Sequence, residues 1–567
     1  MVRKGPLLAL LGAWLLLAGG CSDAGNGADS PSRVVIPPHV AGTVGEYAIY
    51  NSGAPLPVQG YGLVVGLGTN GSREVPAHLK EYMVKYLARQ GLGSAHLGLS
   101  HLTPLRVLQD QDTAIVLLGS AIPFGAPVGA RFDLNLTALP NTQTRSLQGG
   151  FLMPTELRFA WLGRSMPGGP TKMLAEGGGA IFVNPFVDPN NDAELVKWRE
   201  GRVLGGGRVA SAHPVRVQLR RPDYARADLI RRRINETFPG RTKVANARDR
   251  ATLELTVPSK WRDDYEHFLR LVMRIPLVSG ARLESYARRT ILAMEMPGVA
   301  HDELGLVLEA TGRNVVPQLK RLYTSRNRAA AFYAARTGAR LGDRTAEEVL
   351  IRFASERSSL QVPAIEELGR HPDLRAASGA LQALLDDENS RVRIAAYEAL
   401  MRRGGASVIT RVELDNGLKL DLIKSRRSYV IYATQSMEPR IALFGGDMMV
   451  SHPIYFSTAD ELVTVQSRAK DTKLRVFRKL PNGRFSDALE CDFAAKALIT
   501  QLASRPNRDE DGNMQGLGLT YGQMLSVLYR MCQSGDIRAK FSLQPAPVMS
   551  RIRRGSAGVG RADVPGE

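Results

Sequence analysis

Residues 59–67 read Gln-Gly-Tyr-Gly-Leu-Val-Val-Gly-Leu, and this stretch decides how the fold begins. Its apolar centre, residues 61–65, predicts a buried β-strand. Glycines follow in residues 66–71, and residues 75–90 then carry Leu79, Met83, Tyr86 and Leu87 at helical spacing. The sequence therefore predicts a strand, a tight turn and a helix in this order.

The turn itself, Gly-Leu-Gly-Thr-Asn-Gly at residues 66–71, spells G-x-G-x-x-G. A dinucleotide site needs a helix that starts at the third glycine and an acidic residue after a second strand about 20 residues further on. Here residues 72–76 separate the glycine from the helix, and Gln-Gly-Leu-Gly occupies residues 90–93. We therefore interpret the glycines as a tight turn.

The chain around this motif divides by composition and periodicity. Residues 114–118 form another apolar run and residues 131–136 alternate with period two, which is typical of strands. Alternation at 215–219 and 252–257, with helices opened by Asp223 and Ser259, predicts a compact α/β module.

Residues 301–405 shift to helix-forming residues and contain internal similarity. Residues 325–331 resemble residues 390–396, which lie 65 positions further on, and residues 373–377 between them align with residues 389–393 to within a residue or two. The stretch 386–400 resembles a HEAT repeat, although its spacing is shorter than the usual HEAT period. The alternative is a generic bundle of helical hairpins.

The N-terminus predicts export. Arg3 and Lys4 precede an apolar stretch at 7–17, and Ala-Gly-Gly-Cys at 18–21 supplies a cleavage point, as in a secretory signal. Cys21 also resembles the lipidated cysteine of a lipobox, but Ala18 stands where leucine is usual. Both lipidation of Cys21 and ordinary cleavage nearby stay open.

The predicted fold class is α+β with several domains. It combines a β-rich domain, a small α/β module, HEAT-like helical repeats and a C-terminal α+β region. The predicted segments are 1–21 (signal), 22–33 (flexible tether), 34–212 (β-rich), 213–300 (α/β), 301–405 (helical), 406–550 (α+β) and 551–567 (disordered basic tail).

A formal net charge of +19 favours anionic partners. Because an exported protein does not meet nucleic acid, the expected anionic partners are peptidoglycan or outer-membrane headgroups. An oxidising compartment would let Cys491 and Cys532 form a disulfide if the fold brings them together, and two separate buried thiols are the alternative.

Catalytic chemistry is sparse in the sequence. None of the nine histidines forms an i,i+4 pair of the kind that binds zinc, and there is no G-x-S-x-G nucleophile motif. We therefore expect no catalytic residues, no metal and no cofactor.

Three ordered segments carry a resemblance to a known family. Residues 59–67, residues 121–133 (Ala-Ile-Pro-Phe-Gly-Ala-Pro-Val-Gly-Ala-Arg-Phe-Asp) and residues 146–152 (Ser-Leu-Gln-Gly-Gly-Phe-Leu) are similar to the family of flagellar basal-body P-ring proteins, over about residues 34–290. The departures are the lipobox-like Cys21 and the HEAT-like insert.

The resemblance implies a structural subunit that forms a homo-oligomeric ring around the rod, in the periplasm at the peptidoglycan layer, with rod and outer-membrane L-ring proteins as partners. The HEAT-like surface would take a further protein, and lipidated Cys21 would add an outer-membrane anchor. Two alternatives are a periplasmic lipoprotein scaffold outside any flagellum and an exported enzyme on a borrowed fold. The predicted family-motif or ring-interface residues are Gly60, Tyr61, Gly62, Gly66, Pro123, Gly129, Asp133, Leu147, Gln148, Gly149 and Gly150.

Overall fold

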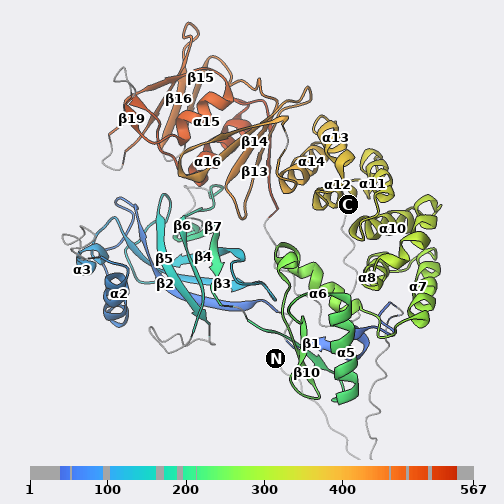
Figure 1. Ribbon diagram of the computed structural model, residues 1–567. Coiled ribbons are helices and arrows are strands. Elements are labelled where there is room, and N and C mark those ends of the chain that lie inside the picture. The colour runs from blue at the N-terminus through green and yellow to red at the C-terminus, as the bar shows by residue number, and fades with distance from the viewer. Residues whose placement is uncertain are drawn as a thin grey trace, which may run out of the picture. The chain divides into compact units, whose positions relative to one another are not determined.

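In the computed structural model, six strands of the described residues close into an antiparallel barrel (Figure 1). Their order around the barrel is β2-β3-β4-β7-β6-β5, and β5 pairs with β2 to complete the circle. The strands are β2 (Leu56–Val65), β3 (Ala114–Ile122), β4 (Arg131–Ala138), β5 (Phe151–Phe159), β6 (Met173–Ala180) and β7 (Glu200–Val209).

The structure describes residues 37–545 except 38, 52–53, 93–102, 161–171, 188–193, 195, 212, 406, 459–461, 481–483 and 509–513. The predicted signal, tether, Cys21 and basic tail therefore lie outside the described residues. No helix in the described part is long and apolar enough to cross a membrane.

Strand β2 is buried on both faces, which explains its continuous apolar run. Val64 lies in the barrel core, whereas Leu63 lies in a second cluster outside it with Leu79 and Met83 of α2 (Ala77–Arg89). The short helix α3 (Pro104–Leu108) adds Leu108 to this second cluster. The predicted strand–turn–helix order is confirmed.

The barrel is inserted into the α/β module. Strand β1 (Ala48–Tyr50) pairs with β8 (Val215–Leu219), so residues 44–50 lie in this module and not in the barrel with which sequence grouped them. The rest of the module comprises α1 (Val44–Tyr47), α5 (Tyr224–Thr237), β9 (Ala245–Ala247), β10 (Thr252–Leu255), the 3-10 helix η3 (Ser259–Asp264) and α6 (Tyr265–Arg274). As predicted, Asp223 caps α5, accepting a hydrogen bond from the Ala225 N–H at 2.9 Å.

Eight α-helices follow in the described residues. They are α7 (Ala281–Met294), α8 (His301–Thr311), α9 (Val316–Leu319), α10 (Arg328–Arg340), α11 (Thr345–Ser355), α12 (Gln361–Arg370), α13 (Arg375–Leu384) and α14 (Ser390–Arg402). Helices α8, α10, α12 and α14 contact one another in sequence order, and α11 and α13 also contact each other, as in a stack of hairpins.

The similar segments 325–331 and 390–396 begin equivalent helices of this stack. Asn327 caps α10 and Asn389 caps α14, each through its side-chain oxygen. Two hairpins therefore fit between the two caps, which is a shorter repeat than HEAT proteins use. Residues 373–377 instead precede and begin α13, in the second layer of helices. The HEAT assignment stays a prediction.

The C-terminal region contains two main sheets and two helices, an α+β arrangement that agrees with the predicted fold class. Its elements are β11 (Ile409–Glu413), β12 (Lys419–Ile423), β13 (Val430–Ala433), β14 (Arg440–Phe444), β15 (Ile454–Ser457), β16 (Val463–Ser467), β17 (Leu474–Arg478), β18 (Leu489–Cys491), α15 (Ala495–Ala503), β19 (Asn507–Arg508), β20 (Met514–Gln515), α16 (Tyr521–Ser534) and β21 (Lys540–Leu543).

The five-stranded sheet, of order β11-β12-β14-β13-β21, is buried on both faces. Tyr432 and Phe444 share a core with the helices, whereas Ile431 and Leu443 share one with the second sheet and α16. The helices and the C-terminal sheet are therefore joined by continuous packing.

Candidate functional site

Gly60 and Gly62 of the first motif lie in strand β2 rather than in a loop. A Cβ at residue 60 would collide with the backbone oxygen of Glu156, and one at residue 62 would lie 2.6 Å from Oγ1 of Thr155. Both collisions involve β5, the strand that closes the barrel against β2. The close approach of β5 therefore accounts for Gly60 and Gly62. Tyr61 between them is half-buried and packs on the cluster of α2.

The turn that begins at Gly66 is held by a carboxylate. The N–H groups of Gly66 and Gly68 donate to Asp112 at 3.1 and 2.6 Å. These are the donors that a phosphate would need in a dinucleotide site. Their use by Asp112 agrees with the interpretation of this G-x-G-x-x-G as a structural turn.

Two of the three motif segments meet at one end of the barrel. Val65 of β2 pairs with Phe151 of β5, and a Cβ at Gly150 would lie 2.5 Å from Cγ1 of Val64. The Leu147 side chain is fully buried, and its N–H donates to the carbonyl oxygen of Trp198 at 2.8 Å. The loop at 146–150 is therefore fixed to the barrel.

The remaining two residues of this loop have local roles. The Gln148 N–H donates to Oγ of Ser146 at 3.0 Å. Gly149 has φ +84°, a conformation that favours glycine. Phe151, directly after the loop, is 50% exposed although it is aromatic.

The third motif segment forms the connection between β3 and β4. Pro123 opens a turn in which its carbonyl oxygen accepts from the Ala126 N–H at 3.1 Å. Gly129 has φ +86°, and its N–H donates to the carbonyl oxygen of Val209 at 2.8 Å. Val128 between them is 48% exposed. One exposed apolar side chain thus lies in or next to each of these two loops, Val128 within the β3–β4 connection and Phe151 at the start of β5 after the loop at 146–150.

Asp133 organises the strands on the other side of the barrel. Its carboxylate pairs with Arg202 at 2.6 Å and accepts the Gly205 N–H at 2.6 Å, where the β4–β7 register shifts. The same carboxylate accepts the N–H of Met437, in the connection between β13 and β14, at 3.1 Å. Asp133 is therefore a structural centre, and sequence gave no signal for its partners.

Cys491 and Cys532 are free thiols in the structure, so the disulfide considered above is not formed in it. Cys491 ends strand β18 and Cys532 lies on α16, and both pack in the same C-terminal hydrophobic cluster. Burial raises the pKa of Cys491 to about 11 and that of Cys532 to about 12, so both thiols stay protonated at neutral pH.

A ladder of buried charges runs through the helices. Arg340 of α10 forms two hydrogen bonds with Glu367 of α12, at 2.6 and 2.8 Å, and lies 3.5 Å from Glu309 of α8. Burial alone would raise the pKa of Glu367, but hydrogen bonds from Arg340 and His371 hold it far below its usual range. His267 of α6 bonds Glu309 at 2.8 Å, which extends the ladder into the α/β module.

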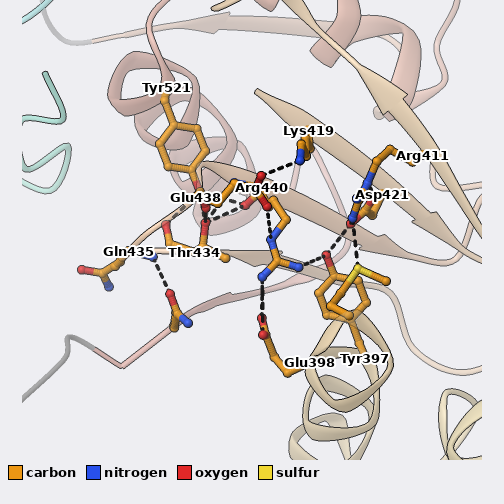
Figure 2. Close-up of polar contacts among 12 residues, drawn as sticks. Tyr397, Glu398, Arg411, Lys419, Asp421, Thr434, Gln435, Glu438, Arg440 and Tyr521 are labelled. Carbon is orange, nitrogen blue, oxygen red and sulfur yellow. Dashed lines mark hydrogen bonds and ion pairs between the residues drawn. The ribbon is translucent and has the colours of Figure 1, made fainter. Parts of the chain in front are cut away.

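A second polar network joins α14 to the C-terminal sheet (Figure 2). Asp421 of β12 accepts a hydrogen bond from the Tyr397 hydroxyl at 2.6 Å and pairs with Arg411 at 2.8 and 2.9 Å. Arg440 donates to the Tyr397 hydroxyl at 3.2 Å and lies 3.4 Å from Glu398. Tyr397, Asp421 and Arg411 satisfy one another within the protein, although the buried Nε of Arg440 has no hydrogen-bond partner among the described residues, so we interpret the network as structural.

Within the described ranges, no group of three or more histidine, cysteine, aspartate or glutamate residues could hold a metal ion.

The sequence of this chain is similar to that of one known protein family. A family model described as "Flagellar P-ring protein" matches residues 50–284. A flagellar P-ring protein of Anaeromyxobacter sp. (strain K) is 32% identical over 219 residues, covering 37% of this chain and 53% of the relative. The chain thus spans about half the length of that relative.

Two further relatives match to a similar extent. A flagellar P-ring protein of Thermotoga maritima is 31% identical over 227 residues, covering 38% of this chain and 61% of its own length. One from Burkholderia mallei is 26% identical over 274 residues, covering 44% and 67%.

Proposed function

We propose that this chain is a structural subunit of the P ring of the flagellar basal body and not an enzyme, because residues 50–284 match the model of the flagellar P-ring protein family. The observation that carries the proposal is the agreement between the family match and the structure. The match includes the whole barrel and ends within α7, just before the stack of helices. The helices and the C-terminal region are then additions to a ring-forming part.

Copies of the chain would form a closed ring around the rod, in the periplasm at the peptidoglycan layer and next to the L ring. A ring repeats one heterologous interface, so each subunit needs two different complementary surfaces. Val128, in the β3–β4 connection, and Phe151, at the start of β5, supply exposed apolar contacts for such surfaces. The stacked helices, which resemble HEAT repeats, would bind a further protein partner.

The test is made on hook–basal bodies purified from the source organism. We expect mass spectrometry to find the chain in a fixed ratio to the rod proteins. We also expect cryo-electron microscopy of a deletion strain to show basal bodies that lack the density of the P ring. Inner-membrane ring proteins, which should stay in both preparations, serve as the control.

Recovery of the chain from the cell envelope but not from basal bodies, with ring density intact in the deletion strain, would refute the proposal. The same purified material gives the mass of the mature N-terminus, which distinguishes lipidated Cys21 from ordinary cleavage.

A further inference from the structure

A cavity of about 770 Å³ lies between loops at one end of the barrel and the C-terminal region. The barrel contributes residues 66–70, residues 142–146, 148 and 149 of a loop, and Trp198, and the C-terminal region contributes Arg478 and Gln523. Small-molecule sites commonly have volumes of about 300–1,000 Å³. The cavity is thus large enough for a sugar or a disaccharide.

The two walls are connected by packing. Phe182, just after β6, is 7% exposed within the hydrophobic core of the C-terminal region. Its ring lies 5.8 Å from that of Tyr521, and Phe186 lies 4.7 Å from Tyr529. The described residues accordingly form one packed unit, in which the cavity is a built feature.

The cavity carries positive charge. Among its described lining residues are Arg145, Arg199, Arg478 and Lys479, and none is an aspartate or a glutamate. Arg199 donates a hydrogen bond to the carbonyl oxygen of Leu139 at 2.6 Å. Because this acceptor is neutral, the bond does not balance the positive charge of Arg199. Such a lining attracts an anion.

Arg478 is the most informative of these cations. Its Nη1 donates to the carbonyl oxygens of Leu517 and Gly518 at 2.9 and 3.4 Å, and its buried Nε has no hydrogen-bond partner. Burial lowers the pKa of Arg478, and among the residues that the structure describes no carboxylate opposes this effect. A carboxylate ligand would supply the missing counter-charge, because guanidinium and carboxylate groups form strong paired hydrogen bonds.

The other lining groups select for a sugar. Trp198 packs against the barrel core and also lines the cavity, where an aromatic surface can lie against the C–H face of a sugar ring. Gln143, Gln148, Asn70 and Gln523 bring side-chain amides, which both donate to and accept from hydroxyl groups.

We propose that this cavity binds a saccharide that carries a carboxylate, with the carboxylate near Arg145 and Arg478 and the sugar ring near Trp198. A wall glycan and an acidic polysaccharide both offer this chemistry. The proposal is independent of the ring role, since it concerns binding by the single chain.

The test is isothermal titration calorimetry on the purified full-length mature chain at low salt. The probes are N-acetylmuramic acid, glucuronic acid, neutral N-acetylglucosamine and acetate. We expect at least one acidic sugar to bind ten or more times more tightly than both the neutral sugar and acetate. Preference for N-acetylmuramic acid would indicate a wall glycan, and preference for glucuronic acid an acidic polysaccharide.

Variants then place the site. Arg478→Gln and Arg145→Gln should each weaken the acidic sugar at least tenfold. Arg475→Gln is the matched control, because Arg475 lies on the same strand as Arg478 but is half-exposed and pairs with Glu490 at 3.6 Å. Arg145 is exposed, so its variant should fold even where the Arg478 variant does not.

Three results would overturn the proposal. They are equal affinity for the acidic and the neutral sugar, equal affinity for acetate and the acidic sugars, and no saturable binding of any probe. Full acidic-sugar affinity in a folded Arg145→Gln variant would place the ligand elsewhere and would equally reject this site.

Discussion

The Tyr397 hydroxyl donates a 2.6 Å hydrogen bond to the carboxylate of Asp421, and both side chains are fully buried. Tyr397 belongs to helix α14 and Asp421 to strand β12, so the bond crosses from the helical stack to the C-terminal sheet. Arg411 pairs with the same carboxylate and supplies its counter-charge. The helices and the sheet should therefore unfold together.

Removing this hydroxyl tests the coupling. Tyr397→Phe should lower the free energy of unfolding by about 1–2 kcal/mol, because Asp421 loses one partner while Arg411 stays. Urea denaturation of the purified chain measures the change. Tyr455→Phe is the control, since Tyr455 is 77% exposed and should change stability by less than about 0.5 kcal/mol.

Loss of the central cation of the charge ladder should destabilise the chain more than loss of the Tyr397 hydroxyl. Arg340→Met leaves Glu309 and Glu367 buried without their cation and should destabilise the chain by about 3–5 kcal/mol at pH 7. Denaturation midpoints measure the effect. Arg357→Met is the matched control, because Arg357 pairs with Glu388 at 2.6 Å on the surface, where such pairs contribute about 0–1 kcal/mol.

The loss should also depend on pH. In the unaltered chain the pKa of Glu367 is depressed, so its contribution is present above the unfolded value of 4.5 and is lost as the pH falls below it. Without Arg340, only His371 still opposes the effect of burial, so this pKa should rise, and protonation of Glu367 then relieves the cost of its buried, less fully paired charge. The difference between the two chains should therefore shrink as the pH falls below about 4.5. A constant difference from pH 7 to pH 4 would contradict this account of the ladder.

The barrel should reject a methyl group at position 60. Gly60→Ala places Cβ against the backbone oxygen of Glu156, which cannot rotate away, and should destabilise the chain by about 1–3 kcal/mol. Gly119 is a close control, because it lies directly opposite Gln59 on β3 and a Cβ there meets nothing within 4 Å. Thermal unfolding of Gly60→Ala and Gly119→Ala measures the difference. Equal stability of the two variants would show that β5 can shift to make room for the methyl group.

Ring assembly should depend on the exposed loop residue Val128. Val128→Glu places a charge on an exposed position, so stability should change by less than about 0.5 kcal/mol. Yet we expect fewer complete P rings and lower motility, counted by electron microscopy and swimming assays. Tyr455→Glu, outside the residues that match the family, should leave ring yield unchanged. Normal ring yield in Val128→Glu would remove this loop from the interface.

Local elements were predictable from the sequence because their signals are local. The alternation at 131–136 and the helical spacing of Leu79 and Met83 correspond to β4 and α2. Asp223 acts as the predicted cap because capping involves only the next few residues.

Long-range relationships could not be predicted in the same way. Closure of the barrel joins residues 58–65 to 151–159, and nothing in either strand specifies that partner. The spacing of Glu309, Arg340 and Glu367, at 31 and 27 positions, is a signal that a search for buried charges between helical repeats could have found. The partners of Asp133 lie 69, 72 and 304 positions away, beyond any local pattern.

Strand β1 ends at Tyr50, and its neighbour β8 begins at Val215, with the Asn51 N–H bonded to the carbonyl oxygen of Arg216 at 3.0 Å. The chain leaves the α/β sheet and returns to it at neighbouring antiparallel positions, where a two-residue hairpin would suffice. The barrel is thus a domain inserted between β1 and β8, at a position where a hairpin turn could connect these two strands. It can be gained, lost or exchanged without re-threading the sheet that carries it.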